Sequence, residues 1–147
     1  MEIDEEGSDG EHYENEMKKA PSTKKIFGTA NYLAPEILAD ETHGKEVDFW
    51  ALGVIIFELL VGRLPFDNPD IQVIYDNIIN VKIDWPEIVK KEDLPKNKDA
   101  ISIEAFHLIK GLLQRDPKER LGNKGINELK NLDFFEGKSF QLIRCRL

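Results

Sequence analysis

The sequence is poor in the residues that build disulfides and metal sites. Its 147 residues include one cysteine, Cys145, so no disulfide can form within the chain and an intracellular, reducing compartment is expected. The three histidines, His12, His43 and His107, lack the spacing of zinc ligands, which argues against a zinc site. The first residues show no signal-peptide pattern, so we expect a protein of the cytoplasm or nucleus.

A hydrophobic run long enough to span a membrane and a strong basic patch are also missing. The longest apolar run, Phe49 to Val61, is interrupted by Gly53 and Glu58 and is too short to span a bilayer. The absence of a strong basic patch argues against nucleic acid as a partner. A hydrophobic fraction of 41% and a charged fraction of 33% fit one soluble domain with its own core.

Negative charge is concentrated at the beginning of the chain. Residues 1–16 contain eight acidic residues and no lysine or arginine, which leaves 20 acids against 20 bases elsewhere. We expect residues 1–24 to form a disordered acidic segment and a basic linker, the latter within Lys18 to Lys25 (KKAPSTKK). A solvated spacer is the simpler interpretation, and a docking site for a basic partner is the alternative.

The central part of the chain predicts helices. Residues 47–60 (VDFWALGVIIFELL) are apolar on nearly every face, which predicts a helix buried all round, with Gly62 as its C-cap. Pro35 predicts a short helix that begins at Pro35 or Glu36. Apolar stripes predict helices over residues 70–79 and from Ser102, a good N-cap, to Gln114. A last short helix is expected over residues 125–132. Residues 90–100 read as a charged loop, and no strand pair is expected.

Four short motifs follow one another in a characteristic order. They are APE (Ala34–Glu36), DFWALG (Asp48–Gly53), PF (Pro65–Phe66) and RDPKERLG (Arg115–Gly122). Together they resemble the C-terminal lobe of a eukaryotic protein kinase from the end of the activation segment onward. The resemblance covers about residues 26–143. It implies a mostly α fold without an N-lobe, with a partial kinase domain at 25–136.

Longer stretches narrow the resemblance to one group of kinases. GTANYLAPEIL, NIINVKIDWP and RLGNKGINELKNLDFF resemble the AGC group of serine/threonine kinases, and are closest to its microtubule-associated, Greatwall and Rim15-like branch. Residues 137–147 would then begin an AGC-type C-terminal extension. The usual activation-loop phosphosite corresponds to Lys25, which cannot make the contacts of a phosphate.

The resemblance implies roles for residues around the APE motif. Ile26, Ala30 and Leu33 would line the apolar platform that receives the substrate residue after the phosphoacceptor. Thr29 would support the catalytic aspartate, which this chain does not contain. Glu58 would read a substrate arginine, with a helix-end carboxylate facing solvent as an equally weighted alternative.

Four further residues are expected to have structural roles. Glu36 and Arg120 would form a buried ion pair that joins two distant segments. Asp48 and Trp50 belong to the motif that opens the central helix. In the family this aspartate holds the backbone of the catalytic loop. With that loop missing here, Asp48 would bond nothing, or only water.

The parts of a kinase that handle ATP are not found in the sequence. It contains no Gly-rich loop, strand lysine, H-R-D or D-F-G motif. ATP and Mg²⁺ would serve the complete kinase, and the chain alone is expected to bind neither and to be inactive. Three hypotheses stay open: part of an active serine/threonine kinase, a non-catalytic kinase-like binding module, and an unrelated helical scaffold. Expected partners are a protein substrate or the rest of a kinase domain, with no membrane.

Overall fold

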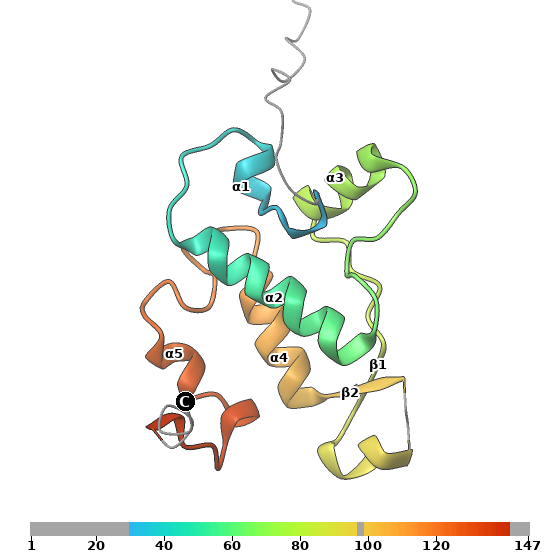
Figure 1. Ribbon diagram of the computed structural model, residues 1–147, viewed down its shortest axis with the longest axis vertical. Coiled ribbons are helices and arrows are strands. Elements are labelled where there is room, and N and C mark those ends of the chain that lie inside the picture. The colour runs from blue at the N-terminus through green and yellow to red at the C-terminus, as the bar shows by residue number, and fades with distance from the viewer. Residues whose placement is uncertain (1–29, 97–98, 142–147) are drawn as a thin grey trace, which may run out of the picture.

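The computed structural model describes residues 30–96 and 99–141, and is mostly helical (Figure 1). In chain order the elements are η1 (Ala30–Tyr32), α1 (Pro35–Leu38), α2 (Glu46–Val61), α3 (Ile71–Ile79), β1 (Glu87–Val89), η2 (Lys91–Lys96), β2 (Ala100–Ser102), α4 (Ile103–Leu112), α5 (Asn127–Lys130) and η3 (Asp133–Phe135), where η marks a 3₁₀ helix. The predicted acidic segment and basic linker, and residues 142–147 of the predicted extension, lie outside the described residues. Within the described part, none of the helices has the length and apolar character needed to cross a membrane.

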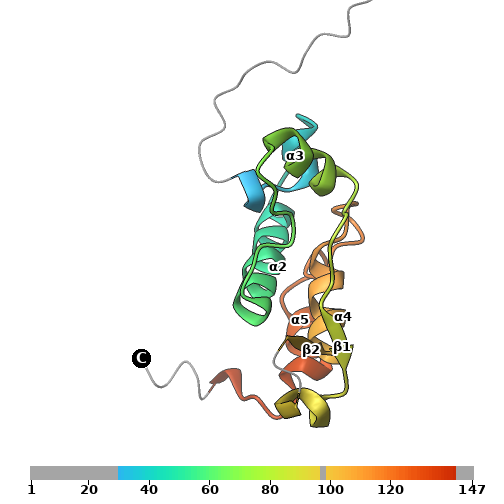
Figure 2. The same ribbon diagram turned by 90° about the vertical axis from the view of Figure 1, so that its right-hand side faces the viewer.

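Helix α2 is the centre of the molecule. It packs along α4 and contacts η1; η1 in turn contacts α3, and α3 contacts α1 (Figures 1 and 2). The approach of α2 to α4 requires a glycine, because a Cβ atom on Gly53 would lie 2.9 Å from side-chain atoms of both Leu112 and Leu113. This close contact places the two longest helices at the base of the core.

The main core forms on one side of α2. Trp50, Val54 and Phe57 are fully buried at helical spacing, and they join Phe66 and Ile109 in one hydrophobic cluster. A second cluster lies between α4 and α5 and contains Leu108, Leu112 and Leu129. The sequence stripe on α4 therefore predicted its buried face correctly.

The prediction that α2 is buried all round is wrong. Ile55, Leu59 and Leu60 are 43%, 78% and 43% exposed. The sequence shows that this face is apolar, but burial requires an element to cover it. Among the described residues, the elements that contact α2 leave these three side chains exposed.

The prediction of no strand pair is also wrong. Strands β1 and β2 form a parallel two-stranded sheet, in which Ile88 is opposite Ile101. The expected loop over residues 90–100 contains η2, with β2 beginning at its end. Three-residue strands are too short to give a period-two pattern, so the sequence carried no usable signal.

Most predicted helix ends are confirmed. The helix at Pro35 begins where proline predicts, and Gly62 ends α2 with a positive φ of 80°. Ser102 caps α4 by accepting a hydrogen bond from the Ala105 backbone N–H at 3.2 Å. Helix α4 ends at Leu112, earlier than predicted, and α5 is only four residues long.

Candidate functional site

The site centres on a buried ion pair between Glu36 and Arg120. The guanidinium donates from Nη1 to Glu36 Oε1 at 2.6 Å and from Nη2 to Oε2 at 2.9 Å. The two residues are 3% and 1% exposed. This two-bond geometry is the one that an arginine makes with a carboxylate and a lysine cannot copy.

The remaining donors of Arg120 are also used. Nε and Nη2 donate to the Gln114 carbonyl at 3.1 and 3.0 Å, and Nη1 donates to the Glu46 carbonyl at 2.9 Å. The guanidinium carbon lies 5.2 Å from the ring centroid of Trp50, which stacks on Phe66 at 5.6 Å. Arg120 therefore joins α1, the start of α2 and the end of α4 at one buried point.

The turn that carries Arg120 is held from both sides. The Leu121 backbone N–H donates to the Gly111 carbonyl at 2.8 Å, and the Gly122 N–H donates to Glu128 Oε2 at 2.9 Å. Gly122 has a φ of 95°, and a Cβ atom there would lie 2.6 Å from the Phe49 ring. Glycine is required at this position on both grounds.

The charge state of Glu36 follows from its partners. Burial favours its neutral form, but the hydrogen bonds and positive charge of Arg120, with a bond from its own backbone N–H, lower the pKa of Glu36 below its usual value. The carboxyl is therefore ionised at neutral pH. Pro35 places it in the first turn of α1, as predicted.

A second polar contact joins the segment before α1 to the end of α2. The Tyr32 hydroxyl donates to Glu58 Oε2 at 2.6 Å. This hydrogen bond, with partial burial and the charge of Glu58, raises the pKa of Tyr32. Glu58 is thus not a carboxylate that simply faces solvent.

The residues predicted to line a substrate platform are only partly placed. Ala30 and Leu33 are half-buried, and the Leu33 backbone N–H donates to the Ala30 carbonyl at 3.1 Å. Ile26 and Thr29 lie outside the described residues. Ala30 and Leu33 thus flank Tyr32, whose hydrogen bond to Glu58 places this segment near the C-terminal end of α2.

The two residues of the helix-opening motif have contrasting surroundings. Asp48 is exposed, and its side chain makes no hydrogen bond or ion pair within the described residues. Trp50 is fully buried, and its Nε1 has no acceptor among the described residues.

The sequence did not predict two contacts of this site: the cation–π contact of Arg120 with Trp50 and the hydrogen bond of the Tyr32 hydroxyl. Both contacts join residues far apart in sequence, so no spacing pattern could reveal them.

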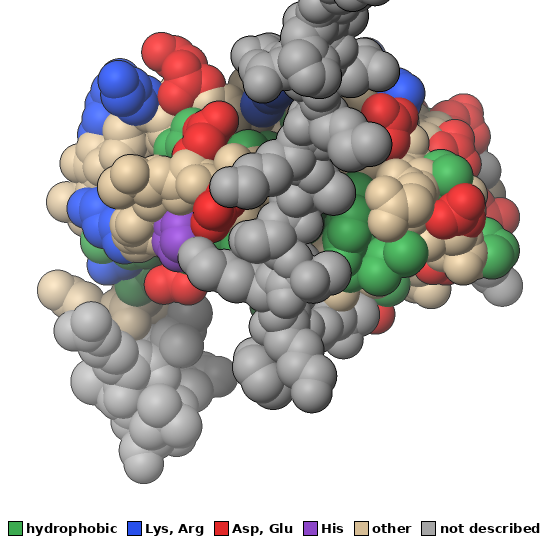
Figure 3. Space-filling view, turned by 90° about the horizontal axis from the view of Figure 1, so that it is seen from above, with side chains coloured by type: hydrophobic (Ala, Val, Ile, Leu, Met, Phe, Trp, Pro, Cys, Tyr) green, Lys and Arg blue, Asp and Glu red, His purple; other side chains and the backbone are tan. Residues whose placement is uncertain are grey.

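Several exposed apolar side chains lie on helices α2 and α3. On α2 it consists of Ile55, Leu59 and Leu60, and on α3 of Ile71 and Val73, which are 48% and 37% exposed. Seen from above, hydrophobic side chains gather on the side of the molecule where α3 lies (Figure 3). These exposed side chains contrast with the apolar side chains that are buried between α2 and α4.

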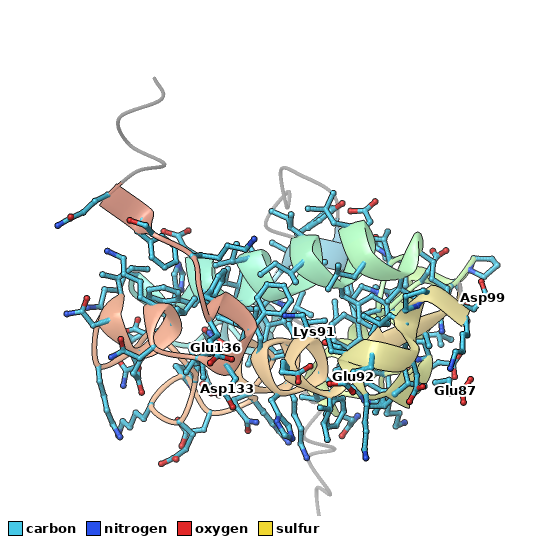
Figure 4. All side chains as sticks on the ribbon, turned by 90° about the horizontal axis from the view of Figure 1, so that it is seen from below. Glu87, Lys91, Glu92, Asp99, Asp133 and Glu136 are labelled. Carbon is cyan, nitrogen blue, oxygen red and sulfur yellow. The ribbon has the colours of Figure 1, made fainter. Side chains whose placement is uncertain are left out.

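Acidic residues on the lower face do not form a metal site. Those labelled in Figure 4 come from β1, η2, η3 and the residues beside β2 and η3, and they spread along that face. Across residues 30–96 and 99–141, no three His, Cys, Asp or Glu side chains are arranged to hold a metal ion. The described residues therefore do not fit a magnesium–nucleotide group.

Sequence comparisons relate this chain to the protein kinases. The sequence model of the protein kinase domain matches residues 12–135. The probable serine/threonine protein kinase IRE of Arabidopsis thaliana is 42% identical over 132 residues, which are 90% of this chain and 10% of that protein. Serine/threonine-protein kinase KIPK2 of the same plant is 40% identical over 123 residues, 83% of this chain and 12% of the relative.

An animal kinase is similar to the same degree. The protein kinase C zeta type of Oryctolagus cuniculus is 39% identical over 129 residues, 83% of this chain and 20% of that protein. The chain thus spans between 10% and 20% of the length of these three relatives. The fold is that of the helical part of a kinase domain, and the chain belongs to the serine/threonine protein kinase family.

Proposed function

We propose that this chain supplies the substrate-facing segment and the helical base of a kinase that transfers the γ-phosphoryl group of ATP to serine or threonine in proteins. We assign it to the C-terminal lobe of a kinase of the AGC group, in the microtubule-associated, Greatwall and Rim15-like branch. The ordered series of four motifs supports this assignment. The family uses ATP and Mg²⁺. We propose that the rest of a kinase domain supplies the groups that bind them.

The observation that carries the proposal is the buried Glu36–Arg120 pair. It fixes α1 to the junction of α2 and α4 through two hydrogen bonds of 2.6 and 2.9 Å. The segment that ends at Ala34 is therefore attached to a rigid base. Precise placement of substrate and catalytic groups is a main source of rate in phosphoryl transfer.

Glu58 supports a preference for basic substrates. Its Oε2 accepts the hydrogen bond of Tyr32, while Oε1 has no partner within the described residues. An arginine of a bound peptide carries the donors that such an oxygen lacks. We propose an intracellular protein substrate with an arginine near the phosphoacceptor, and neither membrane nor nucleic acid as partner.

The test uses the complete kinase domain that contains this chain. Phosphate transfer is measured with paired serine peptides that carry either arginine or alanine upstream. Glu58→Gln should raise KM for the arginine peptide and leave the alanine peptide unchanged, and Glu136→Gln, at an exposed position, serves as control. An equal loss with both peptides would show that Glu58 acts only on structure.

A non-catalytic binding module is the second candidate. It rests on the same Glu58 contact, because a carboxylate held by Tyr32 could bind a peptide arginine without any phosphoryl transfer. The complete kinase domain would then bind the arginine peptide, as measured by fluorescence anisotropy, without phosphorylating it.

The isolated chain is expected to give no heat of binding with Mg-ATP in calorimetry under either candidate. A saturating isotherm in the micromolar range would contradict both.

A further inference from the structure

A cavity of about 260 Å³ lies beside α4, and two of its lining residues, Gln114 and Arg115, offer their backbone carbonyls to Arg120 on the other side. Ile83 and Trp85, from the segment between α3 and β1, form one wall, and Leu113 at the end of α4 forms another. Figure 2 shows that segment running alongside α4. Lys110 and Arg115 also line the cavity, so an apolar wall meets two positive charges.

The two cations lack an acidic partner among the residues that the structure describes. Lys110 and Arg115 are exposed, and neither makes an ion pair with an acidic side chain of residues 30–96 or 99–141. The Lys110 ammonium lies 5.4 Å from the Phe106 ring centroid. By contrast, Arg63 and Lys82 are paired with acids at 3.0 and 2.7 Å.

The size and charge of the cavity indicate the class of ligand. Pockets for drug-sized molecules have volumes of about 300 to 1,000 Å³, so this smaller cavity suits a single large side chain. An aromatic ring would bury its apolar surface against Trp85 and Leu113. Carboxylates on either side of that ring would face Lys110 and Arg115. The matching chemistry is an aromatic residue flanked by acids.

The chain itself contains such a sequence outside the described residues. Residues 11–16 read EHYENE, with Tyr13 between Glu11 and Glu14. The same region carries eight acids and no base in its first 16 residues. The docking interpretation of this segment requires a basic partner, and the cavity provides one.

We propose that residues 11–16 dock on this cavity within the same molecule, with Tyr13 against Trp85 and the acids facing Lys110 and Arg115. Sixteen residues separate Tyr13 from Ala30, and an extended chain of that length reaches roughly 50 Å. The described part of the chain also begins on the correct side of the molecule for this docking. Its first element, η1, contacts α3, and α3 leads into the segment that lines the cavity. The tether raises the effective concentration of the segment to the millimolar range.

Carbodiimide cross-linking of the full chain tests this placement, because it joins a carboxylate to a lysine amine as an amide. Mass spectrometry should find Lys110 joined to Glu11, Glu14 or Glu16 far more often than the exposed control Lys124. Tyr13→Ala should reduce the Lys110 product to the level of Lys124. Equal yields for the two lysines, or no effect of Tyr13→Ala, would overturn the proposal.

Two further arms identify the occupant. When isotope-labelled and unlabelled chains are mixed, each cross-linked product should join two labelled peptides or two unlabelled ones. A product that joins a labelled peptide to an unlabelled one would mean docking on a second copy and would overturn the proposal. Arg115→Glu should lower the cross-link between Lys110 and Glu11, and adding Glu14→Lys should restore it. If Glu14→Lys does not restore the cross-link in the Arg115→Glu variant, while the unfolding curves stay unchanged, the proposed pairing of Glu14 with Arg115 is contradicted. The Arg115 side chain is exposed, so the variant is expected to fold, and Tyr13→Ala tests the proposal independently.

Discussion

Glu36 and Arg120 are 84 positions apart and meet through two hydrogen bonds in the interior of the protein. Trp50 covers the guanidinium from one side, and three backbone carbonyls accept its other hydrogen bonds. A buried ion pair gains little over apolar packing, but loss of one partner leaves a bare charge. The pair therefore holds distant segments together, and the loss of either partner should strongly destabilise the fold.

Removal of either partner should strongly destabilise the chain. Arg120→Ala is expected to lower the free energy of unfolding by about 3 to 5 kcal/mol, and Glu36→Ala by a similar amount. Arg120→Lys should be a partial rescue, because lysine cannot form the second bond. The double variant should lose less than the sum of the single losses.

Urea unfolding of these variants measures the effect. Arg63→Ala is the matched control, because the Arg63–Asp84 pair is an exposed bridge whose loss should cost only about 0 to 1 kcal/mol. If Arg120→Ala costs no more than Arg63→Ala, the buried pair does not stabilise the fold.

The lowered pKa of Glu36 predicts how stability depends on pH. The unfolded carboxyl titrates near its reference value of about 4.3, and the folded one titrates lower. The contribution of Glu36 is therefore fully present above that reference value and is lost as pH falls through the folded pKa. Urea melts from neutral to acidic pH should show a loss of stability that Glu36→Gln lacks. The same acid dependence in both proteins would assign the loss to other carboxyls.

The sequence predicted the fold well where residues obey a local rule. Pro35, Gly62 and Ser102 are placed by backbone angles and capping, and each ends or begins a helix as expected. The buried stripe on α4 follows from helical spacing alone. The exposed face of α2 could not be predicted, because burial depends on which elements lie beside a helix.

The candidate site was predictable only in part. The pairing of Glu36 with Arg120 came from resemblance to a family, since no periodicity relates positions 84 apart. The hydrogen bond from Tyr32 to Glu58 crosses 26 positions and was not foreseen. Physical rules predict which groups need partners, and the fold decides which partners they meet.

The bond between Tyr32 and Glu58 predicts a shifted titration. The raised pKa of Tyr32 means that this contact stabilises the fold below the reference value of about 10 and loses that effect as pH rises. Glu58→Gln should move the pKa of Tyr32 back toward its ordinary value, as followed by NMR of the ring. An unchanged pKa of Tyr32 in Glu58→Gln would show that the contact is absent in solution.

The exposed apolar face of α2 predicts self-association of the isolated chain. Ile55, Leu59 and Leu60 form this face, and exposed apolar patches promote association. Leu59→Lys should lower the sedimentation-derived mass toward that of a monomer without loss of stability, since this side chain is 78% exposed. Phe57→Ala, on the buried face two residues earlier, should instead cost about 3 to 5 kcal/mol. If Leu59→Lys leaves association unchanged while the chain stays folded, the contact surface lies elsewhere, with the α3 residues Ile71 and Val73 as the next positions to substitute.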